Sequence, residues 1–215
     1  MIRPRYISLN EMETITQQIL SDFGFDPLGP SFEPVPIEEI IEFHYELDLV
    51  WEPIDHYGPD SMVMAAIHPE QRLIVLNESC KHLFMSKIGT MNFTLAHELG
   101  HWVLHVSYLQ NRRGTGKLES FYCEIPGKKP PVEIQADMFA GCLLMPELLL
   151  RNAVSSLKWQ GPVRLHHLYE LADRLKVSIS ALRVRLEQLG LLFVEKDGSV
   201  SYTREPTAIQ LCWDI

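Results

Sequence analysis

Two histidines and a glutamate within residues 92–105 have the spacing of a zinc-binding helix. They form the pattern H-E-x-x-H, in which His97 and His101 are four residues apart and Glu98 follows the first histidine. Residues four apart lie on one face of a helix, so both imidazoles can point at one metal ion. A catalytic zinc needs neutral nitrogen ligands, an open position for water and a carboxylate that accepts a proton from that water. The pattern therefore predicts that His97 and His101 bind Zn²⁺ and that Glu98 is the general base.

The alternative is a helix whose histidines are merely packed or solvated. The neighbouring residues are apolar, which predicts a buried helix: Phe93, Leu95, Ala96, Leu99, Val103 and Leu104. Buried histidine and glutamate side chains without partners are costly. We therefore favour metal binding over a purely structural role.

A third protein ligand is expected from residues 131–145, which form a second amphipathic pattern that Pro146 ends. Glu133 and Asp137 are four residues apart on one face of this predicted helix. Glu133 can complete a His-His-Glu zinc site, and Asp137 can accept the free ring N–H of a ligand histidine and fix its tautomer. A solvated acidic face is the alternative, but the surrounding residues are mostly apolar.

Both predicted helices resemble a known family. The segments F-T-L-A-H-E-L-G-H-W-V-L-H and E-I-Q-A-D-M-F-A-G-C-L-L-M-P resemble the two signature helices of the ImmA/IrrE metallopeptidases, and the resemblance weakens after about residue 150. In that family, two histidines and the downstream glutamate hold zinc, and the glutamate after the first histidine is the general base. These roles fall here on His97, His101, Glu133 and Glu98.

The resemblance implies a zinc-dependent endopeptidase that cleaves a partner transcriptional repressor, in stress response, phage defence or the control of mobile elements. Two alternatives from other classes remain open. One is a DNA-binding regulator that uses the zinc fold as a scaffold, and the other is a module that sequesters a repressor without cleaving it. The presence of Glu98 favours the peptidase, because a scaffold needs no general base.

The succession of patterns indicates an α+β fold, with a mainly helical zincin-like domain over residues 1–160. Helices are expected at residues 9–23 and 36–45, a strand at 47–51, and a hairpin with strands at 62–67 and 72–76. The resemblance further implies that this small sheet lies beside the metal helix and offers an edge for substrate.

Residues 161–215 are expected to form a small C-terminal subdomain. Amphipathic helices over 165–176 and 179–189 resemble a helix-turn-helix, and residues 193–202 form a hairpin in the position of a wing. In a DNA-binding protein, Ser180, Arg183 and Arg185 would be the exposed contacts. We favour a subdomain that packs on the peptidase domain, because the local positive charge is modest.

Charge is unevenly distributed along the chain. The net charge is −9, made up of −11 over residues 1–60, 0 over 61–150, +4 over 151–190 and −2 over 191–215. The overall negative charge argues against a general nucleic-acid binder. The basic segment leaves room for local contact with DNA, including single-stranded DNA, as an activating signal.

The remaining features bear on location and on the surroundings of the site. The chain has no run of 18 apolar residues, and its four cysteines form no C-x-x-C pair, so we expect a cytoplasmic protein with reduced thiols. The 26-residue connection from 106 to 131 is either a flap over the cleft or a floppy insertion. His105 lies roughly 12 Å along a straight helix from His97, too far to share the metal ion, so it is expected to be structural or to support a ligand. His166 and His167 are weaker candidates for stabilising an oxyanion.

Overall fold

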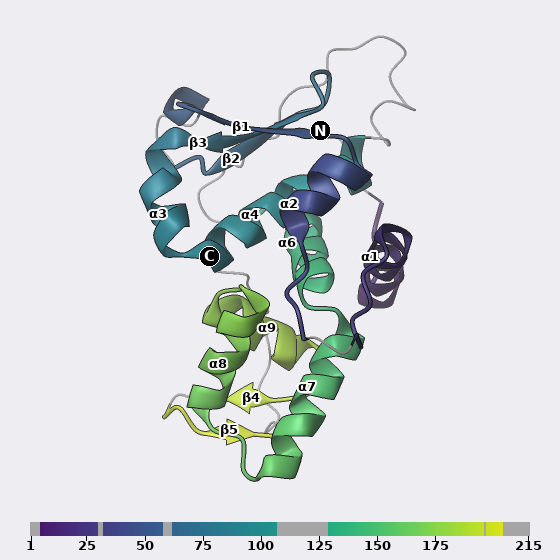
Figure 1. The fold of residues 1–215 in the computed structure, drawn as a ribbon, viewed down its shortest axis with the longest axis vertical. Coiled ribbons are helices and arrows are strands. Elements are labelled where there is room, and N and C mark those ends of the chain that lie inside the picture. Colours follow the sequence, from purple (N-terminus) through teal and green to yellow (C-terminus); the bar gives the residue numbers. More distant parts are fainter. Residues whose placement is uncertain (1–4, 30–31, 58–61, 107–128, 196, 204–215) are drawn as a thin grey trace.

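The computed structural model describes residues 5–29, 32–57, 62–106, 129–195 and 197–203. Helices predominate, and a three-stranded sheet lies at one end of the molecule (Figure 1). The α+β class predicted from the sequence is confirmed.

The two N-terminal α-helices pack against the two helices that carry the predicted metal ligands. The helix α1 (Leu9–Phe23) begins at Ser8, whose hydroxyl accepts the backbone N–H of Glu11, and ends at Gly24 with a φ of 87°. It packs on α6 (Pro131–Leu144). The second predicted helix is present as α2 (Ile37–Glu39), which continues into the π-helix η1 (Ile40–His44).

The sheet has the strand order β1-β3-β2, with β1 (Asp48–Glu52), β2 (Ala65–His68) and β3 (Leu73–Asn77). The central strand β3 pairs in parallel with β1 and antiparallel with β2. The predicted hairpin is therefore confirmed, although β2 begins at Ala65 rather than at residue 62. The edge strand β2 packs against α4 (Ile88–His101). Short helices connect these elements: η2 (Asp55–Tyr57), η3 (Glu78–Cys80) and α3 (Lys81–Ser86).

The two predicted metal helices, α4 and α6, pack tightly against each other in the centre of the molecule (Figure 1). Gly100 permits this approach, because a Cβ atom there would lie 3.1 Å from Cδ1 of Phe139 and 3.2 Å from Cα of Ala136. The chain leaves α4 through the π-helix η4 (Trp102–Val106). Residues 107–128 lie outside the described part, so the choice between a flap over the cleft and a floppy insertion stays untested.

The C-terminal part contains α7 (Glu147–Gln160), α8 (Leu165–Leu175), α9 (Ile179–Gln188) and the antiparallel strands β4 (Phe193–Val194) and β5 (Val200–Ser201). The turn between α8 and α9 has Lys176 in the left-handed region, and Ser178 caps α9. The two predicted helices and the hairpin are present. The winged helix-turn-helix assignment and the domain boundary at residue 160 stay predictions.

The prediction that Arg185 is an exposed contact is wrong. Arg185 is fully buried, forms an ion pair with Glu13 of α1, and donates from Nε to the carbonyl oxygen of Met145 at 3.1 Å. The helical period places this residue on the same face as the buried Leu182, and α1 supplies the carboxylate that its charge needs. Ser180 is exposed and Arg183 is half-buried.

The turn between α8 and α9 packs directly on the start of α4. The side-chain amide of Asn92 donates to the carbonyl oxygen of Lys176 at 3.0 Å. A Cβ atom at Gly89 would lie 2.4 Å from the carbonyl carbon of Val177, so two backbone segments are in contact there. The hydrophobic core is accordingly continuous from α1 through α9.

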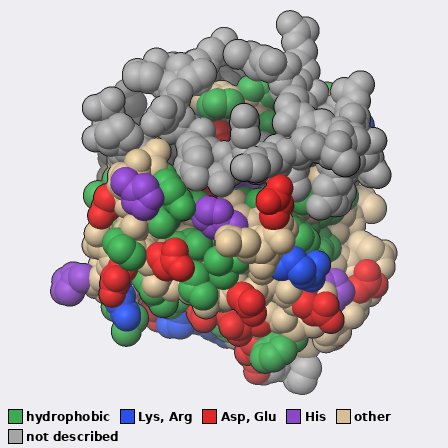
Figure 2. Space-filling model, turned by 90° about the horizontal axis from the view of Figure 1, so that it is seen from above, with side chains coloured by type: hydrophobic (Ala, Val, Ile, Leu, Met, Phe, Trp, Pro, Cys, Tyr) green, Lys and Arg blue, Asp and Glu red, His purple; other side chains and the backbone are tan. Residues whose placement is uncertain are grey.

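Acidic side chains outnumber basic ones on the face seen from above in Figure 2, where histidine and apolar side chains also appear. Within the described residues, no single helix has the length and apolar composition of a membrane span. The pair of α6 and α7 meets those criteria only when taken together, with a bend of 54° between them.

Candidate metal centre

Three side chains from α4 and α6 converge on one point. The Nε2 atoms of His97 and His101 are 3.0 Å apart. Oε2 of Glu133 lies 3.1 Å from Nε2 of His97, and Oε1 of Glu133 lies 3.3 Å from Nε2 of His101. Both histidines lie on the face of α4 that meets α6, and Glu133 lies in the first turn of α6. The structure thus brings together the three residues that the sequence predicts as ligands, in an arrangement that can hold a metal ion.

The donor atoms fit a tetrahedral zinc ion. Bonds of about 2.0–2.1 Å to zinc place the ligand atoms of a tetrahedron about 3.3 Å apart, close to the separations above. The chemistry of the donors agrees, because two ring nitrogens and a carboxylate oxygen are ligands that zinc binds in proteins. The residues present therefore fit Zn²⁺.

Asp137 orients His97. Its Oδ1 lies 2.9 Å from Nδ1 of His97, and its Oδ2 forms an ion pair with the ammonium of Lys129. Asp137 is fully buried. Since a carboxylate accepts, Nδ1 of His97 carries a hydrogen, so Nε2 is the ring nitrogen that faces Glu133 and His101 and can bind a metal ion.

Glu98 lies beside the three candidate ligands. Its side chain is buried, and its Oε2 has no hydrogen-bond partner among the described residues. Burial is the main cause that raises the pKa of Glu98, while the backbone N–H of Ile67 in β2 favours the charged form. A buried carboxylate oxygen without a partner suits a water molecule that reacts there.

In the protein without metal, charge in the site is shared between His97 and Glu133. Burial alone would lower the pKa of His97, but hydrogen bonds to Asp137 and Glu133 raise it to about 10. Burial alone would raise the pKa of Glu133, but hydrogen bonds to His101 and His97 hold it well below its usual range. In the metal-free protein, a proton on His97 therefore supplies the positive charge that a metal ion would supply when bound.

His105 contacts His101 one helical turn beyond the metal centre. Nδ1 of His105 is 3.1 Å from Nδ1 of His101, and its Nε2 is 3.0 Å from Oε1 of Gln135. His101 and His105 are four residues apart, so their rings lie on one face of the helical segment, as do those of His97 and His101. Sequence reasoning missed Gln135, because a residue two positions after Glu133 is expected on another face of the helix.

His166 and His167, the weaker candidates for stabilising an oxyanion, lie on α8. His167 accepts the backbone N–H of Arg164 at 3.0 Å, and so caps the start of α8, while His166 is exposed. The opposite end of α8 is the end that meets α4.

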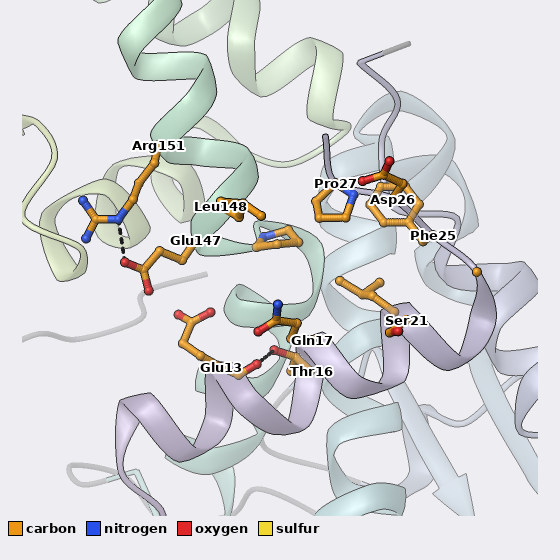
Figure 3. A pocket seen from close by; sticks show the side chains of 13 residues that line it. Glu13, Thr16, Gln17, Ser21, Phe25, Asp26, Pro27, Glu147, Leu148 and Arg151 are labelled. Carbon is orange, nitrogen blue, oxygen red and sulfur yellow. Dashed lines mark hydrogen bonds and ion pairs between the residues drawn. The ribbon is translucent and has the colours of Figure 1, made fainter. Parts of the chain in front are cut away.

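A separate cavity of about 660 Å³ lies between α1 and the start of α7 (Figure 3). Its walls are acidic and apolar, with Glu13, Asp26 and Glu147 beside Phe25 and Leu148. None of its lining residues belongs to the metal centre, and we give it no part in the chemistry because the convergent titratable groups lie elsewhere.

Comparisons with known proteins identify the family to which this chain belongs. A transcriptional regulator of Mycobacterium tuberculosis has a similar fold, with a TM-score of 0.52 and 16% sequence identity. The similarity covers 91% of this chain and 54% of the regulator, so this chain spans about half of the regulator's length. No curated protein matches the chain. The family model Peptidase M78, described as the IrrE N-terminal-like domain, matches residues 55–187, which include α4 and α6. Because this match spans more than half of the sequence, the chain belongs to the IrrE-like Peptidase M78 family, as its resemblance to the ImmA/IrrE metallopeptidases implies.

Proposed function

We propose that this protein is a zinc-dependent endopeptidase of the cytoplasm that cleaves a partner transcriptional repressor. One observation carries the catalytic part of the proposal. The nitrogens of His97 and His101 and the carboxylate of Glu133 converge within 3.0–3.3 Å, and Glu98 lies in the same site with an oxygen that has no hydrogen-bond partner in the described part of the chain. Ligands and base are thus positioned by two helices in contact.

In this proposal, His97, His101 and Glu133 hold the metal, and Asp137 fixes the orientation of His97. When bound, Zn²⁺ would supply a Lewis acid for the substrate carbonyl and would lower the pKa of a water molecule. Glu98 accepts a proton from the attacking water and passes it to the leaving amine nitrogen as the peptide C–N bond breaks. Burial raises the pKa of Glu98, which makes its carboxylate a stronger base for the proton of the attacking water.

The strand β2 is the proposed site of substrate alignment. It is an edge strand that packs on α4, and the backbone of Ile67 in β2 forms a hydrogen bond with the carboxylate of Glu98. A peptide that adds to such an edge binds through its main chain, so its scissile carbonyl would pass beside the metal residues.

Charge favours a basic partner. Residues 1–60 carry a net charge of −11, and the face in Figure 2 shows the excess of acidic side chains. A DNA-binding repressor exposes lysine and arginine, which an acidic surface attracts. This complementarity supports a repressor as substrate.

The decisive test incubates a purified candidate repressor, sought first among the genes that neighbour the gene for this protein, with the zinc-loaded protein. Cleavage should stop with a chelator and return with zinc. The Glu98→Gln variant should bind zinc normally and cleave at least about 100-fold more slowly, since it keeps the shape of the side chain and loses the base. Cleavage by a clean Glu98→Gln preparation at the wild-type rate would remove Glu98 from the mechanism.

The same experiment separates the competing functions. A repressor-sequestering module would bind the repressor and leave it intact under every condition. A DNA-binding regulator that uses the zinc fold as a scaffold would bind an operator duplex and leave the repressor intact.

We further propose that DNA, including single-stranded DNA, binds the segment 151–190 and stimulates cleavage. Exposed groups at the end of α7 support this, since Trp159 is 91% exposed and the ammonium of Lys158 lies 4.2 Å from the ring centroid of Tyr202. Aromatic and basic side chains suit stacked bases and phosphates. Cleavage and fluorescence anisotropy, measured with short oligonucleotides across a salt series, test this. Failure of both binding and stimulation at low salt would leave the segment as a packing unit.

A further inference from the structure

A chain of hydrogen bonds runs from His101 away from the metal centre and ends on the main chain. His101 contacts His105 at 3.1 Å between Nδ1 atoms, and Nε2 of His105 contacts Oε1 of Gln135 at 3.0 Å. Gln135 in turn donates from Nε2 to the carbonyl oxygen of Arg5 at 2.6 Å. The three side chains are 2%, 4% and 7% exposed, so solvent offers few alternative partners.

The direction of each bond follows from the group beyond it. The carbonyl oxygen of Arg5 can only accept, so the amide nitrogen of Gln135 must face it and the amide oxygen must face His105. That oxygen also only accepts. Nε2 of His105 therefore carries a hydrogen and donates it to Gln135.

The contact between the two histidines fixes the last bond. Two N–H groups cannot face each other at 3.1 Å, so one Nδ1 donates and the other accepts. A neutral imidazole that binds a metal through Nε2 carries its hydrogen on Nδ1. His101 must therefore donate to His105, and His105 must be neutral.

We propose that Gln135 and His105 are positioning residues that hold His101 in the Nδ1-protonated tautomer, with its Nε2 lone pair directed at the metal ion. This inference rests on the proposed metal centre. It assigns the two histidine ligands different supports. His97 is oriented by a carboxylate, whereas His101 is oriented by a neutral chain that ends on the backbone of Arg5, which an ion pair of 2.7 Å attaches to Glu11 of α1.

Zinc affinity of the full-length protein, measured by competition with a chromophoric chelator, tests the proposal. His105→Leu and Gln135→Leu each break the chain and should weaken zinc binding about 10–100-fold. His105→Gln should stay within about threefold of wild type, because its amide can accept from His101 and donate to Gln135. Leu104→Ala is the matched control, since Leu104 lines the same cavity of about 350 Å³ as His105 and Gln135 and belongs to no part of the chain of bonds.

A second measurement needs no variant. Long-range ¹H–¹⁵N correlation spectra of the zinc-loaded wild type should show a hydrogen on Nδ1 of His101 and none on Nε2. A hydrogen on Nε2, or wild-type affinity in His105→Leu, would overturn the positioning role while leaving the metal centre intact. Failure of the wild type to bind zinc would overturn both the metal centre and this inference.

Discussion

Arg185 of α9 and Glu13 of α1 form an ion pair across 172 positions of sequence, with the arginine fully buried and the glutamate side chain 16% exposed. The same guanidinium holds the carbonyl oxygen of Met145 at the end of α6. One basic side chain therefore joins the C-terminal helices to α1 and to a metal helix. This use of Arg185 removes it from any DNA-facing surface.

Removing that guanidinium should be costly. Arg185→Met leaves Glu13 and the Met145 carbonyl without their partner, and breaking a buried pair costs about 3–5 kcal/mol. Equilibrium urea unfolding measures the loss. Arg151→Met is the control, because its pair with Glu147 at 2.6 Å lies on the surface and should contribute under about 0.5 kcal/mol. Equal losses in the two variants would show that burial of Arg185 adds no stability.

Glu133→Ala should strongly lower bound zinc while the chain still folds, because it removes one of three ligands and leaves both helices intact. Metal analysis of the purified variant gives the stoichiometry. Asp137→Asn offers a graded comparison, since it keeps an acceptor for His97 and loses the charge, and should reduce affinity about 10–100-fold. Unchanged stoichiometry in Glu133→Ala would mean that the third ligand is misassigned.

Zinc affinity should rise with pH. The pKa of His97 in the metal-free protein is raised to about 10 by Asp137 and Glu133 against the effect of burial. Below that pH the metal must displace a proton, so apparent affinity should increase about tenfold per pH unit between roughly pH 6 and 9. Competition titrations at several pH values measure this slope. A flat profile would show that His97 holds no such proton.

Gly100→Ala should lower zinc affinity more than it lowers the stability of the fold. Exchanging glycine for alanine in a helix gains about 1 kcal/mol, which offsets part of the crowding against Ala136 and Phe139. The spacing of α4 and α6 must nevertheless increase by a few tenths of an ångström. Zinc affinity should therefore fall at least several-fold while urea stability of the metal-free protein changes by less than about 1–2 kcal/mol. The reverse pattern would contradict a role for this contact in ligand spacing.

Local pattern was sufficient to predict much of the fold and the candidate site. The i, i+4 spacing of His97 and His101, and of Glu133 and Asp137, depends only on helix geometry, so their convergence could be foreseen once the two helices were paired. The ion pair of Arg185 could not be predicted from its own segment, because its partner Glu13 lies on α1. Gln135 could not be recognised because its partner, His105, lies 30 positions earlier in the sequence, and local pattern does not show which residues of the two helices meet.

The contact of Gly89 with the backbone of Val177 and Ser178 also sets an order of events during synthesis. Residue 178 leaves the ribosome 89 positions after residue 89, which at roughly 5–20 residues per second is a delay of roughly 4–18 s. The residues of α4 and α6 are complete once residue 144 has been made, 34 positions before residue 178, so both metal helices precede the turn that covers the start of α4 by roughly 2–7 s. A nascent chain can thus assemble its metal ligands before the last helices close over the helix that carries two of them.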